Sequence, residues 1–234
     1  MIVAANLKTH FTRAHTKEYI LQIDTFLKTN HTTNEVFVFP VQTALDSFDT
    51  DINIGAQNAY PTDKGAFTGE IGTQQLDEFG IKTILIGHSE RRHVLNESQD
   101  LIAGKFKYFQ KLGYKIIFCV GEPKEIREQG DVKMMEYLTS QLQGVDLGYK
   151  NLILAYEPVW SIGSGHLPSD KEITDVHAAL RVTCKAPILY GGSVKPDNIK
   201  QITSLSNVDG VLIGGAALKA DDFCSMISIA HCDA

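Results

Sequence analysis

The feature that most constrains this chain is a series of short, continuous apolar segments that recur along its length. They are MIVAAN (1–6), VFVFP (36–40), INIGAQ (52–57), TILIG (83–87), IIFCVG (116–121), NLILAY (151–156), PILYGG (187–192) and DGVLIGG (209–215). Their apolar residues follow one another instead of alternating with polar ones. That pattern is typical of parallel strands that are buried on both faces.

Segments with helical periodicity lie between most of these runs. They include KEYILQIDTFLK (17–28), QDLIAGKFKYFQKLG (99–113), which stops at Gly113, and KMMEYLTSQLQG (133–144), which stops at Gly144. Eight units of roughly 30 residues without a linker predict an α/β fold, a closed (β/α)8 barrel in which residues 1–234 form a single domain. An open, doubly wound sheet is the alternative, but no G-x-G-x-x-G motif follows the first run.

Composition excludes several classes of protein. Hydrophobic residues make up 43% and charged residues 21% of the 234, as in ordinary globular proteins, and no apolar run reaches the roughly 18 residues of a membrane span. The first residues read as a strand and not as a signal peptide, so we expect a cytoplasmic protein without a membrane partner. The net charge of −6 and the scattered lysines and arginines argue against a nucleic-acid partner.

The four cysteines are Cys119, Cys184, Cys224 and Cys232, and no two of them have a C-x-x-C spacing. The scattered positions of the cysteines argue against a structural zinc site and against a disulfide framework. Reduced thiols and no metal site are therefore expected.

In a barrel the active site lies at the carboxyl ends of the strands, where this chain places several polar residues. The first run ends in Asn6 and is followed by Lys8, which would favour an anionic ligand; an ordinary surface lysine is the alternative. The fourth run ends in GHSERR (87–92), where His88 precedes a helix start. Backbone N–H groups there disfavour imidazolium and leave a neutral imidazole that can donate a hydrogen bond, although His88 could equally serve as a simple cap.

The sixth run delivers Glu157 at its end. Pro158 biases Glu157 toward extended backbone, so a stiff strand end holds the carboxylate. A partly desolvated carboxylate is a competent base for a carbon acid, whereas an isolated glutamate would more often form a structural ion pair. The following SIGSG segment (161–165) has few large side chains and could close over a ligand.

Glycine pairs follow the last two runs. They are Gly191 and Gly192, followed by Ser193, and Gly214 with Gly215. Such pairs after the last two strands are typical of the phosphate site of these barrels, because glycine lets backbone N–H groups approach phosphate oxygens. The residues therefore indicate a phosphate-bearing ligand.

Five motifs taken together closely resemble the triosephosphate isomerase family. They are NLK (6–8), GHSERR (87–92), YEPVWSIGSG (156–165), YGGSV (190–194) and VDGVLIGGAAL (208–218), in the order of the family. The resemblance implies a TIM barrel that interconverts dihydroxyacetone phosphate and D-glyceraldehyde 3-phosphate through an enediol(ate). It also implies that neither a metal nor an organic cofactor takes part.

The resemblance also implies a role for individual residues. Glu157 would be the base, His88 the neutral electrophile and Lys8 a positive charge near the substrate. The remaining residues that it implicates are Asn6 as a polar contact, Glu90 as a second carboxylate, Gly163, Ser193, Gly214 and Gly215 around the phosphate, and Trp160 and Tyr190 as supporting side chains.

The segment GAQNAYPTDKGAFTGEIG (55–72) resembles the dimerisation loop of the family. The resemblance implies a homodimer in which Thr68 reaches into the site of the partner. Cys119 is interpreted as a packing residue. The end of the closing loop departs from the family, since His166, Leu167 and Pro168 replace a lysine and two small residues. We hypothesise that the fixed φ of Pro168 restricts bending there.

Two other functions compete with isomerisation. Another phosphosugar enzyme, an epimerase or an aldolase, would need a metal-ligand set or a Schiff-base lysine at a strand end, and the sequence offers no convincing candidate. A non-catalytic phosphate-binding or surface-interaction protein on the same fold would have no use for a base such as Glu157.

Overall fold

The computed structural model describes residues 1–162 and 167–230, and a strand overlaps each of the apolar runs. The strands are β1 (Ile2–Asn6), β2 (Glu35–Phe39), β3 (Asn53–Ile54), β4 (Thr83–Ile86), β5 (Lys115–Val120), β6 (Leu152–Tyr156), β7 (Ile188–Tyr190) and β8 (Gly210–Ile213). The strand prediction is confirmed, although β3 is only two residues long.

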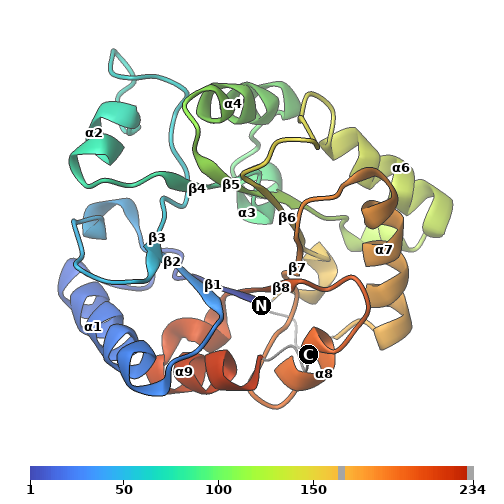
Figure 1. Ribbon diagram of the computed structural model, residues 1–234. Helices are drawn as coiled ribbons and strands as arrows, with labels where there is room; N and C mark the ends of the chain where they lie inside the picture. The colour runs from blue at the N-terminus through green and yellow to red at the C-terminus, as the bar shows by residue number, and fades with distance from the viewer. Residues whose placement is uncertain (163–166, 231–234) are drawn as a thin grey trace.

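The strands form a ring (Figure 1). Within the described residues the sheet has eight strands in the order β3-β2-β1-β8-β7-β6-β5-β4, and the paired neighbours are parallel. A short bridge joins the two outer strands: the Ala56 N–H donates to Thr83 O and the Leu85 N–H donates to Ala56 O, both over 2.9 Å. This bridge closes the barrel and rules out the open sheet.

Helices surround the ring of strands. They are α1 (Arg13–Asn30), α2 (Thr73–Glu78), α3 (Ser89–His93), α4 (Gln99–Lys111), α5 (Lys124–Arg127), α6 (Asp131–Gln141), α7 (Asp170–Thr183), α8 (Ile199–Thr203) and α9 (Ala220–Ile229), with the 3-10 turns η1 (Gln42–Ala44), η2 (Val159–Ser161) and η3 (Gly215–Leu218). The three predicted helical patterns lie in α1, α4 and α6. Gly113, predicted to stop a helix, has φ +76° just after α4. None of the helices in the described residues is long and apolar enough to cross a membrane.

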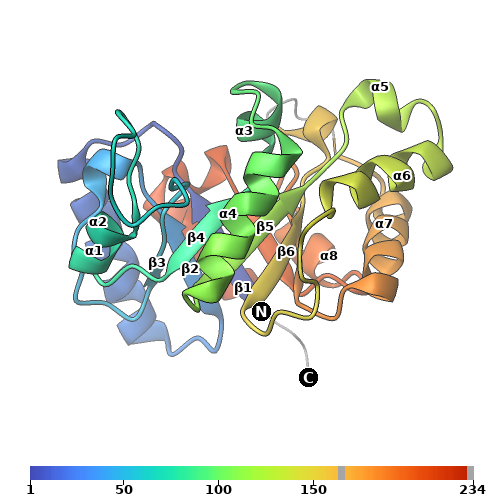
Figure 2. The ribbon, with the colours of Figure 1, turned by 90° about the horizontal axis from the view of Figure 1, so that it is seen from above.

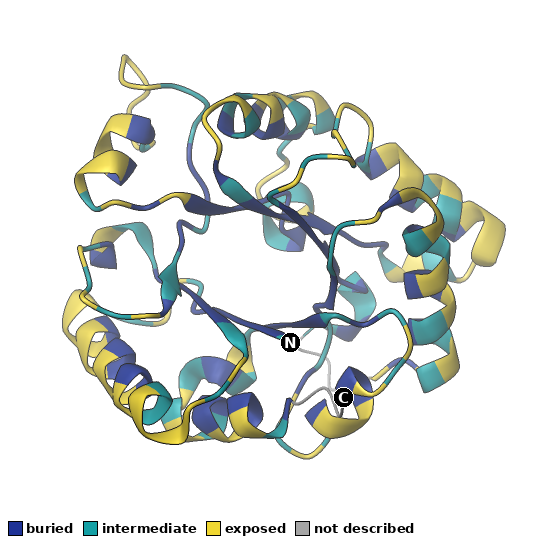
Figure 3. Ribbon diagram, in the orientation of Figure 1, coloured by how far each residue is buried: buried dark blue, intermediate teal, exposed yellow. Residues whose placement is uncertain are grey.

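Two apolar layers build the core. The interior of the barrel is filled from the strands by Ile2, Ala4, Phe37, Phe39, Leu85, Ile117, Cys119, Ile153, Ala155, Leu189 and Leu212. A larger layer lies between the strands and the helices, and the buried side of the helices faces the ring (Figure 3). The short helices α3 and α5, which follow β4 and β5, lie at the same end of the barrel (Figure 2). That end is where the carboxyl ends of the strands meet.

Candidate active site

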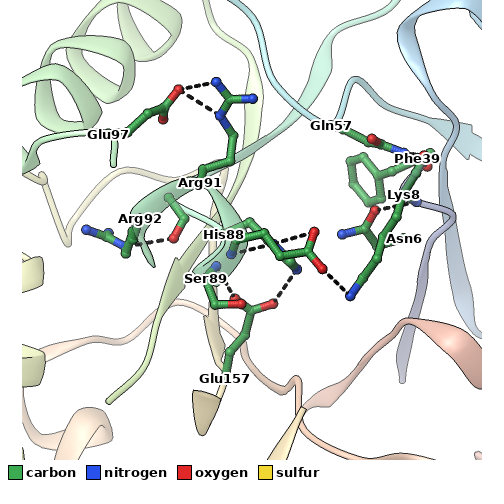
Figure 4. Close-up of polar contacts among 12 residues, drawn as sticks. Asn6, Lys8, Phe39, Gln57, His88, Ser89, Arg91, Arg92, Glu97 and Glu157 are labelled. Carbon is green, nitrogen blue, oxygen red and sulfur yellow. Dashed lines mark hydrogen bonds and ion pairs between the residues drawn. The ribbon is translucent and has the colours of Figure 1, made fainter. Parts of the chain in front are cut away.

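Glu157 and His88 face each other at the carboxyl ends of β6 and β4 (Figure 4). Glu157 Oε1 lies 3.1 Å from His88 Nε2, and the other carboxylate oxygen accepts the Ser89 N–H over 3.0 Å. Both side chains are buried, with Glu157 only 2% exposed. The fold thus brings together a carboxylate and an imidazole that are 69 positions apart in the chain.

The hydrogen bonds of His88 fix the position of its proton. His88 caps α3, and its Nδ1 accepts the Glu90 N–H over 3.2 Å. Because a nitrogen that accepts this bond carries no proton, the neutral ring is protonated at Nε2. That N–H points at the Glu157 carboxylate.

Lys8 lies beside this pair and is held in an unusual backbone conformation. Its φ is +50°, a region that non-glycine residues rarely adopt. The Lys8 N–H donates to Asn6 Oδ1 over 3.1 Å, and Gln57 Nε2 donates to Lys8 O over 2.8 Å. The ammonium group of Lys8 lies 2.6 Å from Glu90 Oε1. Asn6 and Gln57 therefore hold the strained backbone that directs Lys8 toward the site.

A cavity of about 370 Å³ joins these groups to the glycine-rich strand ends. Its walls include Asn6, Lys8, His88, Glu157, Gly191, Gly192, Ser193, Gly214 and Gly215. A Cβ atom built on Gly214 would lie 3.5 Å from Lys8 Cε, so the lysine stem runs beside that glycine. A Cβ on Gly191 would lie 2.8 Å from Glu157 Cγ, so this glycine makes room for the carboxylate.

The supporting residues lie around this cavity and not in its wall. Tyr190 is fully buried, and a Cβ on Gly192 would lie 2.1 Å from its hydroxyl oxygen. Trp160 lies in η2, just after Glu157 in the chain. Thr68 is exposed on the segment between β3 and α2 and does not line the cavity of its own chain. Gly163, which the sequence places near the phosphate, lies outside the described residues, as does His166.

Sequence reasoning missed Glu122. This residue follows β5 and is fully buried, and its Oε1 accepts the Trp160 Nε1–H over 3.0 Å and the Tyr156 hydroxyl over 3.1 Å. Burial raises the pKa of the Glu122 carboxyl. The sequence does mark Glu122 as a candidate site residue, because it directly follows the fifth apolar run as Glu157 follows the sixth.

Cys119 lies inside the barrel behind the site. The thiol is fully buried, and burial followed by the neighbouring Glu157 raises its pKa well above the usual value. A thiol in such surroundings is a poor nucleophile, which supports its interpretation as a packing residue. Within residues 1–162 and 167–230, no group of three or more His, Cys, Asp or Glu side chains could hold a metal ion.

Comparison with known proteins gives one consistent family. The family model described as Triosephosphate isomerase matches residues 1–230. A protein of Sulfurimonas denitrificans with that name is 55% identical over 99% of this chain and 96% of its own length. Proteins of the same name from a Sulfurovum species and from Wolinella succinogenes are 54% and 50% identical, each over 97% of this chain and 99% of their own length.

Proposed function

The chain belongs to the triosephosphate isomerase family, and from this we propose that it interconverts dihydroxyacetone phosphate and D-glyceraldehyde 3-phosphate. The observation that carries the proposal is the pair of Glu157 and His88, a buried carboxylate 3.1 Å from a donating imidazole in a glycine-lined cavity. Aldose–ketose isomerisation needs a base for a carbon-bound proton and a donor for the adjacent carbonyl oxygen. The two side chains are of those types.

In the proposed reaction Glu157 takes a proton from C1 of dihydroxyacetone phosphate. The C–H electron pair forms the C1–C2 double bond, and the carbonyl π electrons move to the C2 oxygen, which His88 Nε2–H stabilises. A proton then passes from the C1 hydroxyl to the C2 oxygen. The C1 oxygen forms the carbonyl at C1, and the C1–C2 π electrons take the proton from Glu157 at C2, which gives D-glyceraldehyde 3-phosphate. In the structure both carboxylate oxygens are engaged, by His88 and by Ser89 N–H, so the Glu157 side chain must leave these partners to reach a substrate carbon.

We assign the phosphate group to the glycine-rich end of the cavity. Ser193, Gly214 and Gly215 line this end, and we include Gly163 from the resemblance alone. Lys8 beside Gly214 would offset part of the charge of the phosphate, and Asn6 would contact the substrate. Glu90, which pairs with Lys8, and Tyr190, which lies under Gly192, are proposed as supporting residues. Trp160 is proposed as a third supporting residue.

We propose a homodimer formed through the 55–72 segment, with Thr68 reaching into the site of the partner. Phe67 beside Thr68 is 42% exposed, and Val94 and Leu95 are exposed as well. Leu95 lines a second cavity, of about 500 Å³, which adjoins Lys8 and could receive a loop. Exposed apolar side chains such as these three are typical of a protein interface.

We further propose that residues 1–234 form one domain and that the protein acts in the cytoplasm. The proton transfers need only a carboxylate and an imidazole, so we propose that the reaction uses no metal or organic cofactor.

Turnover of D-glyceraldehyde 3-phosphate in D2O, followed by proton NMR, tests the proposed reaction. We expect dihydroxyacetone phosphate that carries deuterium at C1 in part of the molecules, because a base exchanges its proton with solvent during the lifetime of the enediolate. A protein that binds the substrate but forms no product would favour the non-catalytic phosphate-binding alternative. Cleavage or epimerisation products would favour the other enzyme class.

A further inference from the structure

Lys195 is a second lysine that lines the cavity, in addition to Lys8. Lys195 follows Ser193 by two positions, is exposed, and lines the cavity together with Ser193, Gly214 and Gly215. The five motifs that resemble the family end at Val194 in this region and do not include this residue. Lys195 is therefore a cation at the end of the cavity to which we assign the phosphate.

The backbone of Lys195 is tied to the phosphate segment. The Lys195 N–H donates to Asn198 Oδ1 over 2.7 Å, and Asn198 Nδ2 donates back to Ser193 O over 3.0 Å. The Ile199 N–H then donates to Lys195 O over 3.0 Å. This closed set of bonds holds the backbone of Lys195 at a fixed place relative to Ser193.

Among the described residues Lys195 has no carboxylate partner in an ion pair, whereas Lys8 has one. Lys8 is paired with Glu90 over 2.6 Å. In residues 1–162 and 167–230, no carboxylate lies within 4.0 Å of the Lys195 ammonium group. The chain as a whole carries a net charge of −6, which repels an anionic substrate. A cation that lines the cavity and is not paired with a described carboxylate counteracts that repulsion locally.

We propose that Lys195 is a substrate-capture residue, which attracts the phosphate group of the triose phosphate and so speeds its entry. The proposal rests on the proposed function for the identity of the substrate. Lys195 takes no part in the proton transfers. In an enzyme whose kcat/KM approaches the diffusion limit, a charge that acts on entry changes kcat/KM and leaves kcat nearly constant. Such an effect weakens with ionic strength, because salt screens exposed charges.

The test compares Lys195→Gln with Lys200→Gln. Lys200 is an exposed residue of α8 outside the cavity wall, so both variants lose one positive charge from neighbouring parts of the chain. At low ionic strength we expect Lys195→Gln to lower kcat/KM by roughly 3- to 10-fold, with kcat changed less than about twofold. The difference should shrink in about 0.3 M salt, Lys195→Arg should restore kcat/KM, and Lys200→Gln should resemble the wild type.

Several outcomes would overturn the proposal. Equal effects of the two substitutions would assign the change to net charge, and a loss of kcat that salt does not alter would assign Lys195 a structural role. Binding of inorganic phosphate, measured by calorimetry, gives a readout that does not depend on turnover. Lys195→Gln should weaken phosphate binding severalfold relative to Lys200→Gln. If the wild type binds phosphate in this Lys195-dependent way without isomerising triose phosphates, the proposed function fails and the capture site stands. If Lys195→Gln binds phosphate as tightly as the wild type, Lys195 does not belong to the site.

Discussion

The indole N–H of Trp160 donates to Glu122 Oε1 over 3.0 Å, and this bond connects the segment after β6 to the segment after β5. Glu122 also accepts the hydroxyl of Tyr156, so one buried oxygen serves two donors on either side of Glu157 in the chain. The position of the proposed base thus depends on a residue from a neighbouring strand end.

We expect Glu122→Ala to lower the free energy of unfolding by about 1–3 kcal/mol, because the buried Tyr156 hydroxyl and the half-buried Trp160 indole lose their acceptor. Trp160 is the single tryptophan of the chain, so its fluorescence can be used to follow the unfolding. Urea unfolding at one protein concentration measures the free energy. Glu122→Gln keeps an acceptor oxygen and should cost less. Glu128→Ala, at an exposed position of the same segment, is the control; an equal urea midpoint for Glu122→Ala and Glu128→Ala would contradict the assignment.

The proposed homodimer can be tested by sedimentation, in which the wild type should have about twice the chain mass of 25.8 kDa. Phe67→Asp should shift it toward the monomer and lower kcat by at least about tenfold, because the proposed contribution of Thr68 to the partner is lost. Leu21→Asp on α1, at a residue that is 66% exposed, is the control and should leave both quantities unchanged. A fully active monomer would contradict the proposal.

Gly121 tests how closely the strand ends are packed around Glu157. A Cβ there would lie 1.8 Å from Glu157 O, and because that oxygen belongs to the backbone it cannot move aside cheaply. Gly121→Ala should therefore lower the free energy of unfolding by about 1–3 kcal/mol and reduce kcat. Gly104→Ala is the matched control, since it lies inside α4 and its built Cβ meets no atom within 4 Å beyond its chain neighbours and the backbone of its own helix. It should stabilise by about 0.5–1 kcal/mol; similar unfolding midpoints for both variants would refute the prediction.

The buried imidazole of His177 should make the free energy of unfolding fall in acid. Burial lowers the pKa of this imidazole from 6.5 to about 4, and its Nδ1 lies 3.0 Å from Asn207 O. Between these two pH values the unfolded chain binds a proton that the folded chain does not, so the free energy of unfolding falls as the pH falls from 6.5 to about 4. The contribution reaches about 3 kcal/mol. His177→Gln should remove this part of the pH dependence in urea unfolding; an identical slope in wild type and variant would contradict it.

The sequence predicts the framework because each of its signals is local. Continuous apolar runs such as TILIG mark buried strands, and polar residues at their ends, such as His88 and Glu157, mark the functional edge of a barrel. Once the eight strands form a ring, those ends must converge. The barrel and the convergence of Lys8, His88 and Glu157 were accessible in this way.

The remaining features depend on contacts between distant residues. Gln57 holds the carbonyl of Lys8 from 49 positions away, and the two outer strands are joined through Ala56, which lies outside β3 itself. No local pattern encodes such pairings. The tautomer of His88 likewise follows from the geometry of the Glu90 N–H, which depends on how α3 begins.

The most direct test of the account is the kcat of Glu157→Gln for D-glyceraldehyde 3-phosphate, measured beside Glu128→Gln. Glutamine keeps the size and an acceptor oxygen of Glu157 but cannot take the carbon-bound proton, so kcat should fall by about 10²–10⁴-fold with an unaltered urea midpoint. Glu128→Gln should match the wild type. A Glu157→Gln protein that turns over at nearly the wild-type rate would contradict the claim that Glu157 is the base.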